Sequence, residues 1–576
     1  MAMMDKKAVA SVLEQVASFM ELKGDNPFRV RAVRTAARTI EGLAVDLDAA
    51  LADGQLAGTR GIGPATLQVI TELVRTGRSS LLEELRGQVP PGLVEMLDIS
   101  GLGVAKIRQI HETLGIDSIP ELEAAAQDGR LAALPRFGQK TAENILKGIA
   151  FRRKASAFRL FHHAAEEAEM LAAALATLPG VLAVHVAGEV RRRLEVVQEV
   201  SLVVVADVAP SELFERLAQL PGVSEFAGRD ERSVTLRTAA GDRAQVIVTT
   251  PVNAGAVLAQ ATGCARHLEQ LAAHAASRGL ALTGAALWRG SVFVPTPDET
   301  AFYAALGLPC IAPELREGQD EVAAAAAGAL PRLLERGDIR GFLHCHSTFS
   351  DGANTVEEMA RAAQAAGYEY LGLTDHSRTA AYAGGLSIDD LQRQADEVDA
   401  VNARLGPGFR VLKGIESDIL VDGALDYPDE VLARLDFVIG SIHGRFNLPK
   451  AEMTARVLRA LEHPRLTILG HPTGRLLLSR EPYAIDLDAV IAKAAETGVA
   501  LEINADPHRL DLDWRMVRAA RAAGALVSIG ADAHNTAGIA NVPYGVGIAR
   551  KGWLRPEDVL NTRDVAGFLA VARRRG

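Results

Sequence analysis

The feature that most restricts the fold of this chain is a series of short apolar segments in its last part, several of which end in a histidine or a carboxylate. They read "YEYLGLTDH", "FRVLKGIES", "DFVIGSIHG", "LTILGHPTG", "VALEINA" and "LVSIGADAH". A helical stretch or a longer excursion separates each segment from the next. Repeated strand–helix units favour parallel strands, and we expect these strands to close into a barrel.

Polar residues gather where these predicted strands end, which in a strand–helix barrel is the face that carries the active site. They are His344, His346, Asp351, His376, Glu416, His443, His471, Asp532 and His534. Alternation along a strand puts His344 and His346 on one face and Cys345 on the other, and Asp532 and His534 repeat the pattern. Nine such residues on one rim predict a metal centre. Imidazole combined with carboxylate favours zinc, manganese or iron over magnesium, which prefers oxygen ligands and water.

The length and composition of the chain restrict its class. A chain of 576 residues exceeds one hydrophobic core, so several domains are expected. No apolar run reaches the ~20 residues that cross a bilayer, and the N-terminal segment lacks the features of a signal peptide. The three cysteines are scattered and cannot form a disulfide framework, which favours a reducing cytoplasm. The net charge of −10 disfavours binding of nucleic acid by bulk charge but is compatible with local basic surfaces.

Three segments in the first part place a hydrophobic residue and a glycine just before an amphipathic helix. They are "RGIGPATLQVI" (60–70), "SGLGVAKIRQI" (100–110) and "PRFGQKTAENI" (135–145). Glycine allows close approach of the backbone, and a helix N-terminus offers free N–H groups to a phosphate oxygen. The segments resemble the helix-hairpin-helix motif, which holds DNA backbone without reading sequence; simple helix connections are the alternative. The predicted DNA contacts are Gly61, Gly63, Gly101, Gly103, Phe137 and Gly138.

The third segment departs from the motif, because Arg136 stands where the motif usually has glycine, although an arginine can supply its own charge to a phosphate. A basic helix, "NPFRVRAVRTAART" (26–39), adds further candidates. Its spacing puts Arg31, Arg34 and Arg38 on one helical face, with Arg29 just before them. A solvated helix face and a stripe that contacts the DNA backbone both remain open for these residues.

The middle of the chain changes to short β-branched runs: "VLAVHVAG", "VSLVVVA", "SVTLRT" and "AQVIVTT". Residues 251–318 mix helix with one hairpin, "GAALWRGSVFVP". The segment that follows, "GQDEVAAAAAGALPRLLERGDI", is low in complexity and predicts a helical linker.

Residues 1 to about 318 resemble a bacterial family X DNA polymerase. The resemblance rests on "NPFRVRA", the three hairpins, "GEVRRRLE", "ATG" (261–263) and "ALGLPCIAPELRE" (305–317). The resemblance implies a multidomain α+β and α/β chain. Its expected parts are a small helical domain with a hairpin (1–85), fingers with two hairpins (86–155), a nucleotidyltransferase-like palm (156–250), a thumb (251–318), a linker (319–337) and a C-terminal barrel (338–576).

The family's palm carries three aspartates that hold Mg²⁺, two of them separated by one residue on a strand and the third on a neighbouring strand. Here these positions correspond to Glu199, Ser201 and Gln245, and Glu189 replaces a serine that contacts nucleotide phosphate. Serine and glutamine supply only neutral oxygen, so Mg²⁺ is not expected there. The resemblance thus implies a retained scaffold without nucleotidyl transfer.

The polymerase-like part could still carry a rebuilt metal site, but it lacks the lysine of a lyase. The alternative to a lost site is a rebuilt one, which would use Glu195, Glu199 or Asp242. The first hairpin helix, "GPATLQVITEL", has no lysine to form a Schiff base with deoxyribose phosphate, so lyase activity by that route is not expected.

Residues 338–576 resemble the PHP (polymerase and histidinol phosphatase) domain, with all nine ligand positions filled. The resemblance implies a distorted seven-stranded βα barrel that binds up to three Mn²⁺ or Zn²⁺ ions and hydrolyses phosphate esters. Glu416 would bridge two ions, and His344, His346 and Asp532 would complete one of them. The residues assigned to catalysis are Glu416, Asp351, His376 and Arg475.

Two arginines follow ligand histidines on the same rim, Arg445 and Arg475. We expect both to contact substrate phosphates; exposed loop arginines without a ligand are the alternative.

The function that these features favour is a Mn²⁺- or Zn²⁺-dependent 3′-5′ exonuclease of DNA repair, with cleavage of abasic sites and removal of 3′-phosphates as additional candidate activities. Three alternatives remain: an active gap-filling polymerase with an attached exonuclease, a non-catalytic DNA-binding protein, and a small-molecule phosphatase similar to histidinol phosphatase. The expected partner is DNA, bound independently of sequence at gapped, recessed or single-stranded ends. A cytoplasmic, nucleoid-associated protein without a membrane partner is expected.

Overall fold

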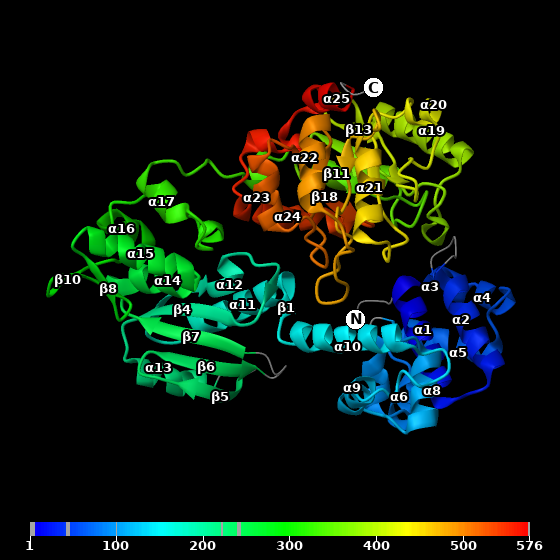
Figure 1. Ribbon diagram of the computed structural model, residues 1–576, viewed down its shortest axis with the longest axis horizontal. Helices are drawn as coiled ribbons and strands as arrows, with labels where there is room; N and C mark the ends of the chain where they lie inside the picture. Colours follow the sequence, from blue (N-terminus) through cyan, green and yellow to red (C-terminus); the bar gives the residue numbers. More distant parts are fainter. Residues whose placement is uncertain (1–5, 42–46, 100, 220–222, 239–242, 574–576) are drawn as a thin grey trace. The chain divides into compact units, whose positions relative to one another are not determined.

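The computed structural model describes residues 6–41, 47–99, 101–219, 223–238 and 243–573 (Figure 1). The chain forms two compact units, Met1–Ala157 and Phe158–Gly576. Asp242, one of the alternative palm carboxylates, lies outside the described residues. Within the described ranges, no helix is both long and apolar enough to cross a membrane.

The first unit is helical throughout its described part. One core of buried side chains runs from Val9 to Ile149, so its two predicted halves share the same hydrophobic interior. The amphipathic helices place their apolar faces in that core, which is what a 3.6-residue period predicts. The helices are α1 (Lys6–Lys23), α2 (Pro27–Glu41), α3 (Leu47–Ala52), α4 (Gln55–Gly58), α5 (Pro64–Thr76), α6 (Ser80–Gln88), α7 (Pro91–Glu95), η1 (Met96–Asp98), α8 (Val104–Leu114), α9 (Ile119–Gln127) and α10 (Gln139–Ala155).

The second unit begins with a five-stranded sheet in the order β2-β4-β7-β6-β5. Strands β4 and β7 are parallel, and the other pairs are antiparallel. The four strands predicted for this region are confirmed. The elements are β1 (Arg159–Leu160), α11 (Phe161–Ala176), β2 (Val181–Ala187), α12 (Gly188–Arg191), β3 (Val196–Val197), β4 (Val200–Ala206), α13 (Pro210–Leu217), β5 (Val223–Arg229), β6 (Ser233–Thr238) and β7 (Arg243–Thr249).

A helical subdomain with the predicted hairpin follows the sheet. Its elements are η2 (Pro251–Asn253), α14 (Ala254–Thr262), α15 (Ala265–Ser277), β8 (Ala281–Thr283), β9 (Ala286–Arg289), β10 (Val292–Val294), α16 (Glu299–Ala305) and η3 (Pro313–Leu315). The prediction of a helical linker is wrong beyond α17 (Glu321–Ala326). Gly328 takes a positive φ of 66° just after that helix, and Pro331 cannot continue one. The remaining segment reaches the barrel, where Leu334 is buried in its core.

The barrel is an eight-segment parallel sheet in the order β13-β12-β11-β18-β17-β16-β15-β14. Its two edge segments, β13 and β14, are consecutive in the chain and separated only by Gly414 and Ile415, so they form one interrupted strand. Main-chain bonds join the segment after β12 to β14: the amide of Glu416 donates to Asp375 O (3.1 Å), and the amide of Ser377 donates to Glu416 O (3.0 Å). The predicted distorted seven-stranded barrel is thereby confirmed.

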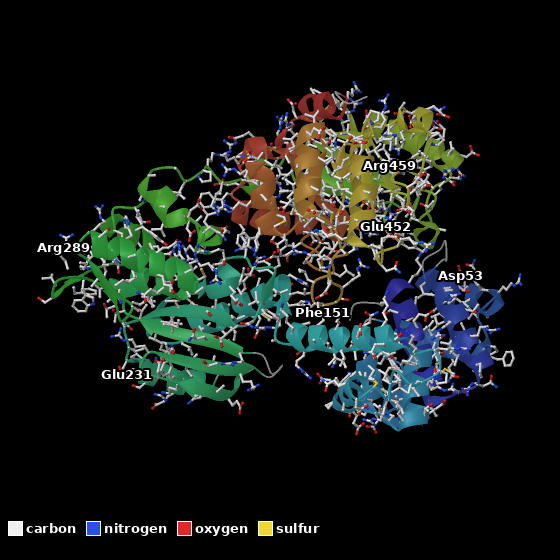
Figure 2. All side chains as sticks on the ribbon, in the orientation of Figure 1. Asp53, Phe151, Glu231, Arg289, Glu452 and Arg459 are labelled. Carbon is white, nitrogen blue, oxygen red and sulfur yellow. The ribbon has the colours of Figure 1, made fainter. Side chains whose placement is uncertain are left out.

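Helices surround this barrel, and their polar faces point away from it. In α21 (Lys450–Leu461), Met453 and Val457 enter the core, whereas Glu452 and Arg459 are exposed (Figure 2). The strands are β11 (Gly341–Cys345), β12 (Tyr370–Leu373), β13 (Arg410–Lys413), β14 (Glu416–Asp418), β15 (Ile439–Ser441), β16 (Ile468–Leu469), β17 (Ala500–Asn504) and β18 (Val527–Ala533). The other helices are η4 (Arg336–Asp338), α18 (Val356–Ala365), η5 (Ala381–Ala383), α19 (Ile388–Leu405), α20 (Asp429–Leu432), α22 (Leu487–Thr497), α23 (Trp514–Ala522), η6 (Thr536–Asn541), α24 (Val542–Lys551), η7 (Pro556–Asp558), η8 (Leu560–Thr562) and α25 (Val565–Arg573).

The barrel interior is apolar at the end where the strands begin. Leu343, Leu412 and Ile468 form a buried cluster there with Phe568 of the C-terminal helix α25. The ring of Phe568 lies 5.6 Å from that of Tyr370, centroid to centroid. This packing leaves the opposite end, where the strands finish, for polar side chains.

Candidate metal centre

The structure brings all nine predicted ligand residues together at the carboxyl ends of the barrel strands. Within each of four overlapping groups, one donor atom per residue lies within 4.8 Å of the others. The groups are His346–Asp351–His376–His534, His344–His346–Glu416, His344–His471–Asp532, and His376–Glu416–His443.

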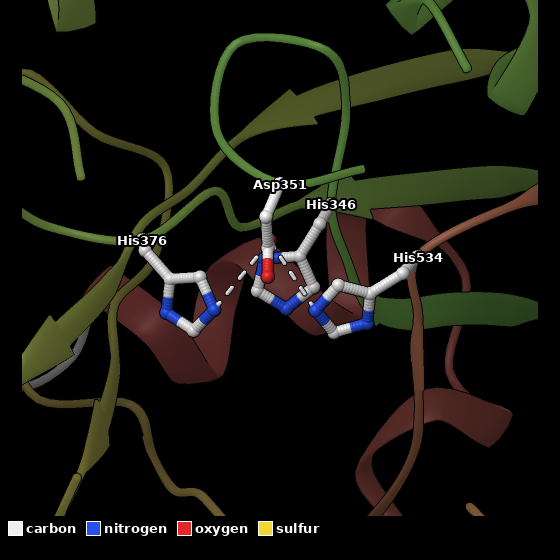
Figure 3. Close-up of side chains that lie close together, drawn as sticks. All are labelled: His346, Asp351, His376 and His534. Atoms are coloured by element: carbon white, nitrogen blue, oxygen red, sulfur yellow. Dashed lines mark ion pairs between the residues drawn. The ribbon is translucent and has the colours of Figure 1, made fainter. Parts of the chain in front are cut away.

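The first group surrounds the carboxylate of Asp351 (Figure 3). Its Oδ1 lies 3.3 Å from His534 Nε2 and 3.7 Å from His376 Nε2. The ring of His346 stacks between those of His534 and His376, at centroid distances of 4.2 and 4.4 Å. Asp351 and His534 have side chains 29% exposed, so this group lies on the solvent side of the centre.

The carboxylate of Glu416 lies at the middle of the cluster and is buried. Its Oε1 is 3.3 Å from His344 Nε2, 3.2 Å from His443 Nε2 and 3.0 Å from His471 Nε2. Two ligands held at about 2.0–2.1 Å on one tetrahedral ion are themselves about 3.3 Å apart. The separations around Glu416 therefore match donor atoms that share a cation.

Three of these ligand residues have unusual backbone conformations. His344, His471 and Asp532 have positive φ values of 58°, 25° and 51°. The pairing register of β11 shifts between Leu343 and Cys345, which marks a bulge at His344. Bulges and strained residues occur preferentially beside active sites, where they redirect side chains. Here His344 faces the centre while Cys345 enters the hydrophobic core on the helix side.

Further carboxylates orient the histidines, and sequence reasoning missed them. Glu502 on β17 lies 2.5 Å from His344 Nδ1 and accepts the amide of His471 at 2.7 Å. Asp418 lies 2.5 Å from His443 Nδ1. A carboxylate on the second ring nitrogen fixes the tautomer of a metal-binding histidine and raises its basicity. The signal was present in "LEIN", a charged residue in an otherwise apolar buried strand.

The electrostatics of the centre favour positive charge. Burial alone would lower the pKa of His344, but Glu502, Asp532 and Glu416 raise it well above its ordinary value. Against the same effect of burial, carboxylates raise the pKa of His443 to about 10 and that of His534 to about 9. Burial and two neighbouring histidines lower the pKa of His346 to about 3, which keeps it in the neutral, metal-binding form.

The donor atoms themselves also fit a cation. Nε2 of His344 and Nδ1 of His346 are buried, and neither makes a hydrogen bond within the described part of the chain. Imidazole nitrogens and carboxylate oxygens in this proportion suit zinc or manganese. The residues present therefore fit one or more divalent metal ions.

The two rim arginines differ in their surroundings. Arg475 is 11% exposed, and its guanidinium donates to Arg509 O at 3.0 Å and to Leu510 O. It also pairs with Asp513 (3.3 Å) and Glu195 (3.5 Å). Through these contacts Arg475 holds a loop in place. The structure therefore does not support the expectation that Arg475 contacts phosphate.

Two other arginines lie near the centre. Arg445 is exposed and has a positive φ of 63°. Arg509, which sequence reasoning missed, lies with its Nε 3.6 Å from Asp532 Oδ2.

Of the three positions that the resemblance assigns to the palm site, two lie on neighbouring strands, and Glu199 lies just before β4. Ser201 on β4 pairs directly with Gln245 on the parallel strand β7. Glu199 lies 3.6 Å from Arg243, and the carboxylate of Glu189 accepts the amide of Gln198 at 2.6 Å. The side chain of Glu195, an alternative ligand, instead meets Arg475 in the barrel.

The three hairpin loops of the first unit share one backbone geometry. Gly61, Gly101 and Arg136 have φ values of 100°, 88° and 68°, so the arginine adopts the conformation that glycine has in the other two loops. Gly63, Gly103 and Gly138 are the N-caps of α5, α8 and α10 and have extended backbone. The side chain of Phe137 is buried in the core, and contact of this residue with DNA stays a prediction.

The arginines of α2 divide into two kinds. Arg31, Arg34 and Arg38 line a cavity of about 480 Å³ together with Arg108 of α8. Arg29 instead pairs with Asp25 at 3.1 Å. Arg34 is also 2.5 Å from Glu21, so part of its charge is already balanced.

The fold and site define a polymerase-like chain that carries a histidine-rich barrel of the phosphoesterase type. Family models agree, part by part. They match a helix-hairpin-helix domain (residues 4–79), a SAM-like helix-hairpin-helix tandem (93–150), a DNA polymerase beta thumb (257–317) and a PHP domain (343–506). The hairpin and thumb matches support DNA as the partner.

Similar proteins identify the family. The chain is 38% identical over 574 residues to the "DNA polymerase/3'-5' exonuclease PolX" of Bacillus subtilis, which covers 98% of this chain and 99% of that protein. It belongs to the family X DNA polymerases that have a C-terminal PHP domain. The barrel alone is 28% identical over 235 residues to a "Probable phosphatase" of Syntrophotalea carbinolica, 38% of this chain and 90% of that protein. A "Probable phosphatase" of Acetivibrio thermocellus is 34% identical over 165 residues, 28% of this chain and 63% of that protein.

Proposed function

We propose that this chain is a metal-dependent 3′-5′ exonuclease, in which the barrel hydrolyses DNA phosphodiesters and the hairpins and thumb hold the DNA. The observation that carries the proposal is the convergence of nine histidines and carboxylates on one strand-end rim, with Glu416 in contact with several of them. The name of the Bacillus subtilis relative supports the same activity. Repair of damaged ends is the setting that such an activity serves.

The ligand groups point to as many as three ions, Mn²⁺ or Zn²⁺. Asp351, His376 and His534 would hold the outermost, and Glu416 would be shared by two others with His344, His443, His471 and their neighbours. Metal ions in such a cluster lower the pKa of bound water and neutralise charge on phosphoryl oxygens.

The protein's own groups orient the reaction. Glu502 and Asp418 hold the imidazoles of His344 and His443 in one tautomer through their second ring nitrogens. Arg509, beside Asp532, supplies a cation at the rim that can bind a phosphate oxygen. We therefore assign to Arg509 the phosphate-binding role first expected of Arg475.

We further propose that the palm no longer transfers nucleotides. Ser201 and Gln245 provide no carboxylate between the paired strands, and Glu189 adds negative charge nearby. A cluster of neutral oxygens does not hold Mg²⁺ tightly. The DNA-binding parts then serve to present gapped, recessed or single-stranded ends to the barrel, independently of sequence.

The test is an end-labelled primer–template incubated with Mn²⁺, with and without nucleotides. We expect shortening in both reactions, and loss of shortening in His344→Ala and more completely in Glu416→Ala, because Glu416 contacts several ligand groups. Arg459→Ala, on the exposed face of α21, is the matched control and should retain activity. Extension by the wild type, or undiminished digestion by both site variants, contradicts the proposal.

One further activity has support from the relatives. The two barrel relatives carry the name "Probable phosphatase", so removal of a 3′-phosphate from DNA by the same centre is a second candidate. A primer with a 3′-phosphate, incubated under the same conditions, distinguishes release of phosphate from release of a nucleotide.

A further inference from the structure

An aromatic side chain stands beside the metal centre without a role in it. Tyr382, on the short helix η5, is 72% exposed. The centroid of its ring lies 6.2 Å from that of His376 and 6.4 Å from that of His443. Both histidines belong to the ligand groups, so this ring borders the place where a scissile phosphate would bind.

The loop that carries Tyr382 is held at both ends. Ser377 and Leu386 form a bridge, and the amide of Leu386 donates to His376 O at 2.9 Å. The amide of Thr379 donates to the buried carboxylate of Asp426 at 2.8 Å. Gly385 packs so closely on Ser377 that an added Cβ would lie 2.0 Å from its carbonyl oxygen. The ring is therefore presented on an anchored loop rather than on a free one.

The surroundings of the ring leave it available to a ligand. Its plane makes angles of 54° and 70° with those of His376 and His443, so neither imidazole stacks on it in parallel. Three large apolar side chains are exposed on the described residues of the barrel: Tyr382, Ile388 and Val421. Tyr382 is the aromatic one among them, and it is the most exposed.

We propose that Tyr382 stacks on the base of the terminal nucleotide whose phosphodiester lies at the metal centre. The inference rests on the proposed exonuclease function and specifies how that site recognises its substrate. Every base has a π-face, so stacking on one tyrosine tolerates any sequence, as DNA held through its backbone requires. A small phosphate ester without a base would leave this ring exposed.

The experiment compares two oligonucleotides that differ at one position. One ends in an ordinary 3′ nucleotide, and the other ends in an abasic tetrahydrofuran nucleotide. The quantity measured is the ratio of kcat/KM for release of the first residue, ordinary over abasic, with Mn²⁺. Base–aromatic stacking predicts a ratio of about 5 to 150 for the wild type.

Variants of Tyr382 test whether its ring is what distinguishes the ordinary end from the abasic end. Tyr382→Ala should bring the ratio close to one, chiefly by slowing digestion of the ordinary end, whereas Tyr382→Phe should keep the wild-type ratio. Ile388→Ala removes an exposed apolar side chain at the start of α19 and should also keep it.

Each opposite result has a distinct meaning. A wild-type ratio near one, or an unchanged ratio in Tyr382→Ala, overturns the stacking role while leaving the exonuclease intact. A ratio that falls equally in Ile388→Ala shows that the loop rather than the ring discriminates, and also overturns it. Failure of the wild type to digest either oligonucleotide removes the proposed function, and this inference falls with it.

Discussion

Arg136 adopts the backbone conformation that the other two hairpins give to glycine. The left-handed region costs an L-residue roughly 1–2 kcal/mol, and Arg136 adopts it in a loop that we expect to contact DNA phosphate, so we infer a use for its charge. We predict that Arg136→Gly and Arg136→Ala weaken DNA binding equally, because both remove the guanidinium. Arg136→Gly should be more stable than Arg136→Ala by about 1 kcal/mol, because only glycine relieves the strain.

Urea denaturation and fluorescence anisotropy with labelled duplex measure the two effects of Arg136 separately. Unchanged affinity in both variants would show that the arginine is tolerated in the loop rather than used there. Equal stability of the two would show that the positive φ carries no strain.

Glu502 and Asp418 act on the centre through the histidines that they orient. We predict that Glu502→Gln and Asp418→Asn each raise the Mn²⁺ concentration for half-maximal nuclease activity by about 10- to 100-fold. The side chains keep their shape, but the hydrogen-bond partner of each imidazole loses its charge. Activity at saturating Mn²⁺ should recover in part. A metal titration that matches the wild type would assign these carboxylates a purely structural role.

At the scale of the element, the hairpins contain glycines of two kinds: those that need positive φ and those that cap the following helix. Gly61 and Gly101 are needed for positive φ, but Gly63 and Gly103 have extended backbone that any residue adopts. Among the described residues, an added Cβ at Gly103 meets nothing within 4 Å, and one at Gly63 meets only Thr66 Oγ1 at 3.9 Å. The fold therefore leaves room at both positions, and a close ligand is what would require glycine there.

We predict that Gly63→Leu and Gly103→Leu, made together, weaken DNA binding at least tenfold, because the side chains obstruct approach of phosphate to the helix N-termini. The unfolding midpoint should change little. Binding should fall with salt in the wild type, since the contacts are to backbone phosphate. Hydrolysis of a small chromogenic phosphodiester by the barrel should be unaffected; its loss would show that the hairpins do something other than hold DNA.

At the scale of the whole molecule, the sequence was most informative where a metal-binding residue follows a recognisable strand. The barrel strands and their histidines could be recognised because several strands are short apolar runs that end in or just before a ligand residue. The bulge at His344, the role of Glu502 and the engagement of Arg475 could not, because they depend on residues distant in the chain. The predicted helical linker failed because Gly328 and Pro331 interrupt the helix, and the apolar residues that follow pack on two neighbouring cores.

The loop after β2, at residues 188–195, holds parts of the second unit together through its charged side chains. Arg192 lies 2.9 Å from Glu317, and the buried Lys551 of the barrel lies 2.6 Å from the same carboxylate. Lys551 also donates to Arg192 O at 3.1 Å, and Glu195 meets Arg475. Side chains of this loop thus join the five-stranded sheet region, the thumb and the barrel, which gives the loop a structural role independent of nucleotide transfer.

The proposed loss of nucleotidyl transfer can be tested by rebuilding the three-carboxylate site. In a Glu416→Ala background, in which we expect no digestion, the protein should not extend a primer with Mg²⁺. Glu199→Asp, Ser201→Asp, Gln245→Asp and Glu189→Ser, added together, should restore weak extension. The reason is geometric: positions 201 and 245 are direct partners on parallel strands, so two new carboxylates would lie side by side across β4 and β7, where a Mg²⁺ ion can bridge them. Gel analysis of a labelled primer, with one and with four nucleotides, measures the gain. Robust extension by Glu416→Ala alone would show that other carboxylates hold the metals and that the palm is still a polymerase.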